Sequence, residues 1–232
     1  MKPRAIFFDL GGTLMSMDRD LVAREYVTLA QARGATRDFT TTRAMVAALD
    51  DEIPARAKKS PPLSLDERVG EIFWTTLFAD GWARLDLARD DAAAQALYQK
   101  FQRGHFNRLF DDTRPALDAL KSRGLQLGVL SNFTANCAEV LQTLGIANYF
   151  SSVVVSALVR AEKPARAIFD VAARTTICAP HEIVLVGDSI HHDVDGARGA
   201  GWDAILLDRD DWYPNYSAAP RVRRLTEIVN WI

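Results

Sequence analysis

Short runs of apolar residues, each about the length of one strand, open the chain and recur through its second half. They occupy residues 5–8, 125–130, 153–156, 183–186 and 204–207. A continuous apolar run of this length is typical of a strand that is buried on both faces, as in a parallel sheet. From residue 114 onward, segments with helical spacing and short turns separate the runs. The pattern therefore predicts an α/β fold with a Rossmann-like parallel sheet.

Prolines and glycines mark the helices that we expect between these strands. Pro115 suits the first turn of a helix, and Gly124 can take the left-handed conformation that ends it. The same kinds of signal predict further helices over residues 135–144, 164–174 and 193–200. We expect the last stretch, residues 221–232, to close the edge of the sheet.

The segment between the first two predicted strands shows helical spacing and no β-type alternation. The candidate helices cover residues 19–33, 41–51 before Pro54, 64–78 and 91–109. Ser64 and Glu67 have the spacing of a capping box, which supports the start of the third helix. We therefore predict a helical insertion, residues 16–107, in a core made of residues 1–15 and 108–232.

Composition and charge narrow the classes of function. The chain has 232 residues, of which 48% are hydrophobic, and a formal net charge of -2. It carries no block of like charges, so we expect neither nucleic acid nor an anionic membrane as a partner. No apolar run approaches the roughly 18 residues that a membrane span needs, and the chain enters its first strand without room for a cleavable signal. These features predict a cytoplasmic protein, and they favour no particular oligomeric state.

Polar residues that can carry chemistry follow four of the predicted strands. In chain order they are Asp9, Ser131, Asn132, Lys163, Asp188 and Asp193. The carboxyl ends of parallel strands meet at one edge of a sheet, where open α/β folds bind ligands. Carboxylates brought together there repel one another unless a cation lies among them, and Mg²⁺ prefers an all-oxygen site. The arrangement therefore predicts a magnesium site at this edge.

This ordered set resembles the haloacid dehalogenase superfamily of aspartate-nucleophile hydrolases, over nearly the whole chain. The insertion is similar to the family's helical cap, which closes over the site and selects the substrate. The resemblance implies that Asp9 attacks phosphorus to form an aspartyl-phosphate and that Lys163 neutralises the developing phosphoryl charge. It also implies that Thr13, Ser131 and Asn132 bind the phosphate.

The resemblance assigns the metal to the carboxylates of Asp9, Asp188 and Asp193 and to the backbone carbonyl of Gly11. One position departs from the family pattern. Two residues after the nucleophile the family places a second acid, which does acid-base work, and this chain has Gly11 there. Glycine keeps the carbonyl and cannot perform the acid-base step.

Taken together, these features predict a hydrolase: a magnesium-dependent phosphatase of a small phosphorylated metabolite, weakened by Gly11. Two alternatives stay open. A haloacid dehalogenase-type hydrolase needs no second acid, but that branch works without metal and leaves Asp188 and Asp193 uncompensated. A catalytically lapsed phosphate-binding or interaction protein also accounts for Gly11. His191 and His192 lie in the acidic loop outside the family motif, and we expect them to be solvated.

Overall fold

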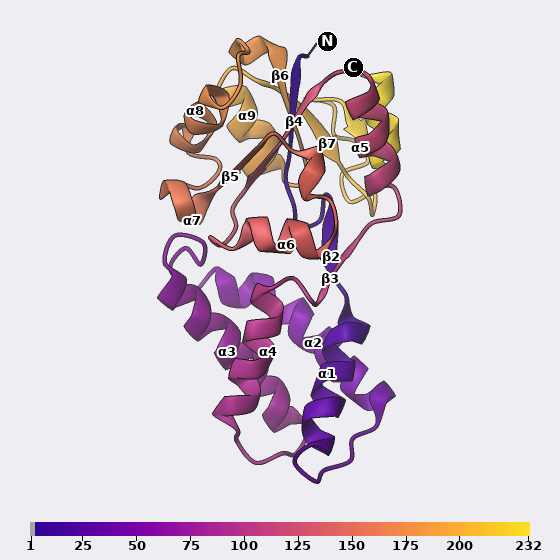
Figure 1. The fold of residues 1–232 in the computed structure, drawn as a ribbon, viewed down its shortest axis with the longest axis vertical. Coiled ribbons are helices and arrows are strands. Elements are labelled where there is room, and N and C mark those ends of the chain that lie inside the picture. The colour runs from indigo at the N-terminus through magenta and orange to yellow at the C-terminus, as the bar shows by residue number, and fades with distance from the viewer. Residues whose placement is uncertain (1–2) are drawn as a thin grey trace. The chain divides into compact units, whose positions relative to one another are not determined.

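The apolar run at the start of the chain forms β1 (Ala5–Phe8) in the computed structural model, which describes residues 3–232. β1 lies between β4 and β6 in a six-stranded sheet with the order β5-β4-β1-β6-β7-β8 (Figure 1). The other strands are β4 (Gln126–Ser131), β5 (Ser152–Val155), β6 (Ile183–Gly187), β7 (Asp203–Leu207) and β8 (Arg221–Val222). All neighbouring strands are parallel. The predicted α/β fold with a Rossmann-like parallel sheet is confirmed.

Helices cover both faces of this sheet, so β1 is buried on each side. These helices are α5 (Thr113–Ser122), α6 (Cys137–Thr143), α7 (Ser156–Val159), α8 (Arg166–Arg174), α9 (Gly196–Gly199) and three 3₁₀ helices at Ala147–Tyr149, Pro180–Glu182 and Leu225–Asn230. Ile6 and Phe8 belong to the apolar cluster that includes α5 and α6. Ala5 and Phe7 belong to the cluster that includes α8 and α9, on the other side (Figure 1). The alternation follows from the two-residue period of a strand.

The strand order places β1 where the connections of the sheet diverge. β4 and β5 extend the sheet on one side of β1, and β6 and β7 extend it on the other. Ligands of open α/β sheets bind beyond the carboxyl ends of the strands at such a point. Asp9, the first residue after β1, donates its backbone N–H to the carbonyl of Val186 at 3.0 Å. Asp9 is therefore fixed to the sheet at this edge.

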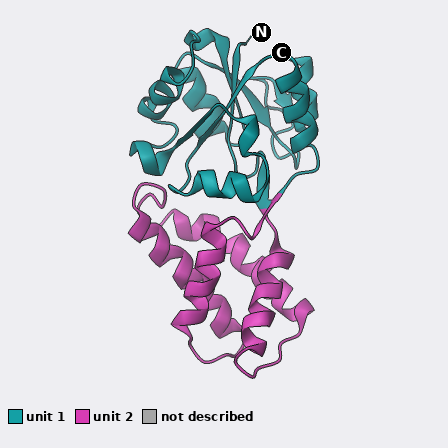
Figure 2. Ribbon diagram, in the orientation of Figure 1, with its two compact units in different colours: residues 1–16, 109–232 teal, residues 17–108 magenta. Residues whose placement is uncertain are grey.

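Residues 17–108 form a second compact unit, unit 2, and the described residues up to Ser16 and from Leu109 onward form unit 1 (Figure 2). The helices of unit 2 are α1 (Arg19–Gln31), α2 (Phe39–Ala57), α3 (Glu67–Arg84) and α4 (Asp91–Gln102). Each begins after an aspartate whose side chain accepts a first-turn backbone N–H: Asp18, Asp38, Asp66 and Asp90. Within residues 3–232, no helix has both the length and the apolar character that a bilayer crossing requires.

Unit 2 has an aromatic core of its own. The hydroxyl of Tyr26 donates to the carbonyl of Phe78 at 2.9 Å, and the indole N–H of Trp82 donates to the carbonyl of Ala88 at 2.8 Å. A Cβ on Gly81 would overlap the Tyr26 hydroxyl, so glycine permits this close approach of α1 and α3. The polar atoms of the large aromatic residues are thereby satisfied inside the core.

Two helices of unit 2 differ from the sequence prediction. The helix expected over residues 41–51 continues through Pro54 to Ala57. Because Pro54 lies in the last turn, it removes only one hydrogen bond near the end of the helix. The third helix begins at Glu67 and is capped by Asp66, which accepts from the N–H groups of Arg68 and Val69. The predicted capping box starting at Ser64 is therefore wrong by two residues.

The helix expected over residues 91–109 is also shorter in the structure. It ends at Gln102, and Gly104 takes a φ of +76° just beyond it. The chain then forms β3 (Asn107–Leu109), which pairs with β2 (Met15–Met17) where the chain passes between the units. A three-residue strand is too short to give a recognisable pattern, and neither strand was predicted.

Two helix starts in unit 1 need correction. α8 begins at Arg166 rather than at Pro164. The helix expected from Asp193 begins only at Gly196, because residues Ile190–Asp195 form a wide π-helical turn. The carbonyl of Ser189 accepts from both Asp193 and Val194 in this turn. Asp193 therefore lies inside the turn and not at the start of a helix.

Candidate active site

A buried lysine bridges two carboxylates at the carboxyl edge of the sheet. The Nζ of Lys163 lies 2.7 Å from Oδ1 of Asp9 and 2.5 Å from Oδ1 of Asp193, and its side chain is 2% exposed. Burial alone would lower the pKa of Lys163, but the two carboxylates outweigh it and raise this pKa above its ordinary value. The ammonium is therefore charged at neutral pH and fixes the orientation of Asp9.

Asp188 adds a third carboxylate beside this bridge. Burial, together with the charges of Asp9 and Asp193, raises the pKa of Asp188 to about 7. One oxygen from each of the three carboxylates lies within 4.8 Å of the other two. Three carboxylates beside one ammonium leave an excess of negative charge in a largely desolvated place. The oxygen donor set is that of a hard divalent cation.

Glycines allow the strand-end loops to approach these carboxylates. Gly12 has a φ of +74°, and a Cβ there would overlap the carboxylate of Asp188. A Cβ on Gly187 would likewise overlap the carboxyl group of Asp193. Gly11 differs from both, because no atom beyond its chain neighbours lies within 4 Å of the place of its Cβ. Unlike Gly12, it also has no positive φ. Side chains are excluded at Gly12 and Gly187, but not at Gly11.

The two polar residues after β4 have different surroundings. Ser131 is 3% exposed and lines the same cavity as Asp9. The amide of Asn132 holds the backbone of Lys163 at both ends: Nδ2 donates to the Lys163 carbonyl at 3.0 Å, and Oδ1 accepts from its N–H at 2.7 Å. The side chain of Asn132 thus helps to position Lys163.

Thr13 contacts Asp188 from outside the cavity. Its side chain is fully buried, and its hydroxyl donates to Oδ1 of Asp188 across 3.5 Å, a long contact. It is not among the described residues that line the cavity. Its hydroxyl therefore contacts the Asp188 carboxylate in this structure, and the binding of phosphate by the hydroxyl or the backbone amide of Thr13 stays a prediction.

The remaining predicted site residues line one cavity of about 320 Å³ in unit 1. They are Asp9, Gly11, Ser131, Asn132, Lys163, Asp188 and Asp193. The other three lining residues are Phe133, Ser189 and His192, which were not predicted from the sequence as site residues. The Oγ of Ser189 accepts from the His192 N–H at 3.1 Å and lies 3.1 Å from its Nδ1. His192 is exposed, as expected, and its place in the acidic loop was the available signal that it borders the site.

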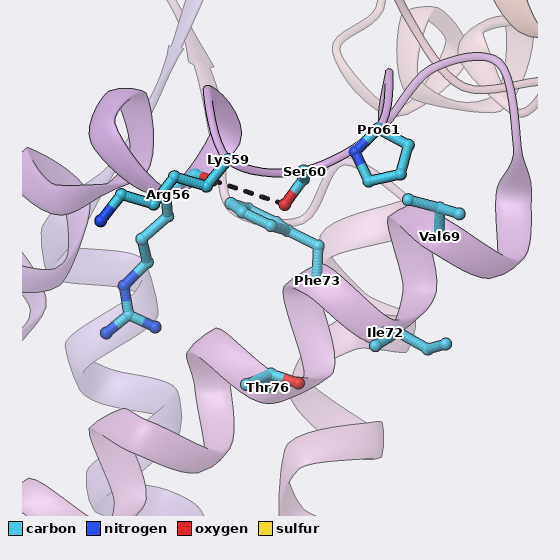
Figure 3. Close-up of a pocket in the computed structure, with 8 residues that line it drawn as sticks. All are labelled: Arg56, Lys59, Ser60, Pro61, Val69, Ile72, Phe73 and Thr76. Carbon is cyan, nitrogen blue, oxygen red and sulfur yellow. Dashed lines mark hydrogen bonds between the residues drawn. The ribbon is translucent and has the colours of Figure 1, made fainter.

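Unit 2 contains a larger cavity, of about 420 Å³, between the end of α2, the loop after it and α3 (Figure 3). Its lining residues are Arg56, Lys59, Ser60, Pro61, Val69, Ile72, Phe73 and Thr76. The guanidinium of Arg56 is engaged by Glu52 and Asp80, and the Ser60 hydroxyl donates to the Arg56 carbonyl. This lining holds no carboxylate and no buried ion pair of the kind around Lys163. Chemistry, rather than size, therefore identifies the cavity of unit 1 as the candidate active site.

Known proteins resemble this chain over different extents. The glyceraldehyde 3-phosphate phosphatase of Methanothermobacter thermautotrophicus is 42% identical over 104 residues, which are 44% of this chain and 46% of that protein. The phosphoserine phosphatase of Thermus thermophilus is 34% identical over 116 residues, 50% of this chain and 47% of that one. The chain thus matches less than half the length of these two phosphatases. Haloacid dehalogenase-like hydrolase domain-containing protein 3 of Xenopus laevis is 28% identical over 211 residues, 89% of this chain and 85% of the relative.

Solved structures share the fold at lower identity. The HAD-hydrolase YfnB of Bacillus subtilis, bound to magnesium, has a TM-score of 0.71 at 17% identity and covers 100% of this chain and 99% of its own. A HAD phosphatase from Thermococcus onnurineus has a TM-score of 0.62 at 22% identity, covering 98% and 97%. A family model described as haloacid dehalogenase-like hydrolase matches residues 3–201. The chain therefore belongs to the haloacid dehalogenase-like hydrolases.

Proposed function

We propose that this hydrolase is a magnesium-dependent phosphatase of small phosphate monoesters that works through an aspartyl-phosphate on Asp9. The observation that carries the proposal is the buried bridge from Asp9 through Lys163 to Asp193, with Asp188 beside it. Such a site combines an oriented nucleophile with fixed positive charge. The two phosphatases among the relatives support a phosphate ester as the substrate class.

The residues of the cavity divide the work of phosphoryl transfer. A carboxylate oxygen of Asp9 attacks phosphorus, and the bond from phosphorus to the ester oxygen breaks. The ester oxygen leaves with the bonding electron pair, as an alkoxide or phenolate, and takes a proton from water. Lys163 holds Oδ1 of Asp9 and offsets the negative charge that develops on the phosphoryl oxygens. The hydroxyl of Ser131, at the end of β4, donates to one of those oxygens. Water then attacks the phosphorus of the aspartyl-phosphate and releases Asp9 and phosphate.

The three carboxylates form an oxygen donor set of the kind that magnesium prefers. Asp9, Asp188, Asp193 and the backbone carbonyl of Gly11 would hold it. Oδ1 of Asp193 is bound by Lys163, and its Oδ2 accepts from the N–H of Ser189 at 3.0 Å. Asp193 is thereby fixed before any ligand arrives. When bound, magnesium offsets the charge of the carboxylates and of the phosphoryl group.

Gly11 limits the range of leaving groups. A positioned general acid contributes about 10²- to 10⁴-fold to rate, and this turn has none two residues after Asp9. Esters whose alcohol leaves as a stable anion, such as p-nitrophenyl phosphate, are therefore expected to react faster than alkyl esters. The same absence leaves the water that attacks the aspartyl-phosphate without a carboxylate base at this position.

A haloacid dehalogenase is the second candidate, and Gly11 is the observation that favours it. Displacement of halide by an aspartate needs no proton donor for the leaving group. The cluster of Asp9, Asp188 and Asp193 weighs against it, because a carboxylate substrate would add a further negative charge to a site with one ammonium. The cluster has a clear use only with a cation.

The test is a screen of phosphate monoesters and 2-haloacids, with magnesium and with chelator, on the wild-type protein and on Asp9→Asn. We expect hydrolysis of p-nitrophenyl phosphate that needs magnesium and falls to background in Asp9→Asn. Halide release without magnesium would replace the proposal by the second candidate. Binding of phosphate without turnover of any ester would identify a lapsed enzyme.

A further inference from the structure

Arg209, the second residue after β7, directs its side chain at the turn after Asp9. Arg209 donates from Nη2 to the carbonyl of Thr13 at 2.8 Å and from Nε to the carbonyl of Gly12 at 3.3 Å. These carbonyls belong to the turn that leaves β1, almost two hundred residues earlier in the chain. One guanidinium therefore fixes two successive peptide groups of this turn.

The guanidinium is itself held from two further sides. Nη1 and Nη2 of Arg209 donate to the two carboxylate oxygens of Asp112, at 3.1 and 3.0 Å. The Asp112 side chain is 3% exposed and also accepts the N–H of Leu225 at 2.8 Å. The guanidinium lies 3.9 Å from the centre of the Phe110 ring. The bidentate pair with Asp112 and the stacking on the Phe110 ring together fix the orientation of the Arg209 guanidinium.

The turn that Arg209 holds touches the carboxylate of Asp188. A Cβ on Gly12 would overlap the carboxylate of Asp188, and the hydroxyl of Thr13 donates to the same group. Asp9 lies three residues before Gly12, with its own N–H fixed to β6. A displacement of this turn would therefore change the contacts of Asp188 and the path of the backbone directly after Asp9.

We infer that Arg209 is a positioning residue, which keeps the turn after Asp9 in its productive geometry from outside the cavity. The inference rests on the proposed function, because its kinetic consequence is loss of phosphoryl transfer. Arg209 is not among the described residues that line the cavity, so it acts through the backbone of Gly12 and Thr13. Misplacement by about 1 Å at a reacting centre costs on the order of 10²-fold in rate.

The experiment compares Arg209→Met and Arg209→Lys with the wild-type protein. We expect Arg209→Met to lower kcat for p-nitrophenyl phosphate by about 10- to 100-fold with KM changed less than about threefold. Arg209→Lys keeps the charge without the planar fork, so it should recover only part of kcat. Amide hydrogen exchange over residues 10–15 should quicken in Arg209→Met, and this readout needs no turnover.

Arg221→Met is the matched control. The side chain of Arg221 is 19% exposed, against 17% for Arg209, and it pairs with Asp208 next in sequence to Arg209. Among the described residues, its side-chain hydrogen bonds go to Asp208 and Asp211, and none goes to the turn at Gly12. We expect this variant to lower the melting temperature while kcat and exchange over residues 10–15 stay at wild-type values.

Each outcome bears on the inference. Wild-type exchange over residues 10–15 in Arg209→Met would overturn it, and so would an equal loss of kcat in Arg209→Met and Arg221→Met. If the wild-type protein hydrolyses no phosphate ester, the proposed function fails, while faster exchange in Arg209→Met alone would still establish that Arg209 holds the turn.

Discussion

The turn after Asp9 contains two adjacent glycines that differ in what a side chain would cost. At Gly12 a positive φ and overlap with Asp188 both oppose a side chain, whereas neither applies at Gly11. The lack of an acid two residues after Asp9 is therefore not imposed by the backbone. It is a chemical property of this chain, and substitution can reverse it.

We predict that Gly11→Asp raises the turnover of an alkyl phosphate more than that of p-nitrophenyl phosphate. The carboxyl group would protonate a leaving alkoxide, which the aryl ester does not require. The gain for the alkyl ester is expected to reach about 10²-fold, the low end for a positioned general acid. The measurement is kcat/KM for both esters in the wild-type and variant proteins.

Two further variants control this prediction. Gly11→Asn introduces a side chain of the same size without an acid, so it should leave the ratio of the two esters unchanged. Gly12→Asp should lower the melting temperature, because its Cβ meets the Asp188 carboxylate and its φ is left-handed. A wild-type enzyme that already cleaves both esters equally fast would show that another group supplies the proton.

At the scale of residues, the sequence predicts which polar residues follow the strands. It predicts less well which groups their side chains contact. Asp9 directly follows an apolar run, and Lys163 and Asp193 lie in the segments that come after two further runs. The partner of Asn132 is the backbone of Lys163, and those of Arg209 include the backbone of the turn after Asp9. Backbone partners leave no trace in residue type, so the sequence could not identify these contacts.

Elements with a strong pattern were predicted well, and those set by tertiary contacts were not. The five apolar runs all form strands, and Gly124 takes a positive φ after α5 as expected. Gly145 does the same after α6. β2 and β3 have three residues each and exist through pairing with each other. The π-helical turn at Ile190–Asp195 is likewise defined by contacts that carry Asp193 to Lys163, not by helix propensity.

The start of α1 offers a prediction about one such element. Oδ1 of Asp18 accepts from the N–H groups of Asp20 and Leu21 at 2.8 and 3.2 Å, and its other oxygen pairs with Arg108. We expect Asp18→Ala to lower the free energy of unfolding by about 1 to 2 kcal/mol. Asp18→Asn keeps the cap without the charge and should cost less. Urea unfolding at pH 7 measures both.

The same residue predicts a pH dependence. Burial tends to raise the pKa of Asp18, but hydrogen bonds from the backbone of Leu21 and from Arg108 outweigh it and lower this pKa. The stability that the ionised group contributes is present above its unfolded pKa of about 3.9 and is lost as pH falls through the lower folded value. The difference between wild type and Asp18→Asn should therefore shrink below about pH 4. A difference that is constant from pH 7 to pH 3 would contradict the charge assignment.

At the scale of the whole molecule, each unit has its own apolar core. The cluster that includes Tyr26, Trp82 and Phe106 draws only on unit 2, whereas the two clusters around β1 draw on unit 1. We predict that an excised segment, residues 17–108, folds as a helical bundle that unfolds cooperatively. Far-ultraviolet circular dichroism during heating measures the cooperativity of unfolding. We expect Trp82→Ala to abolish it, because the substitution leaves a large cavity in the core. A broad, non-cooperative melt of the wild-type segment would show that unit 2 depends on the rest of the chain.

Magnesium should stabilise the whole protein through the carboxylates of unit 1, in a measurement that requires no substrate. A ligand that binds only the folded state at about 100 times its Kd adds about 2.7 kcal/mol of stability, and about 2–4 °C of melting temperature accompanies each kcal/mol in a chain of this size. We therefore expect a rise of roughly 5–10 °C with saturating magnesium at pH 7.5, against potassium chloride of equal ionic strength.

Asp188→Asn should lose this rise and should melt above the wild-type protein without magnesium, because it removes one of three neighbouring carboxylates. Asp195→Asn is the matched control, since Asp195 is an exposed acid two residues after Asp193. It should keep the full rise. If Asp188→Asn keeps the rise in melting temperature, the ion binds elsewhere. If both variants lose the rise equally, the net charge of the protein, rather than this cluster, governs binding. If the rise in melting temperature is lost in Asp188→Asn and kept in Asp195→Asn, the carboxylates around Lys163 bind the cation. This conclusion does not depend on the rate of catalysis, and therefore not on the effect of Gly11 on that rate.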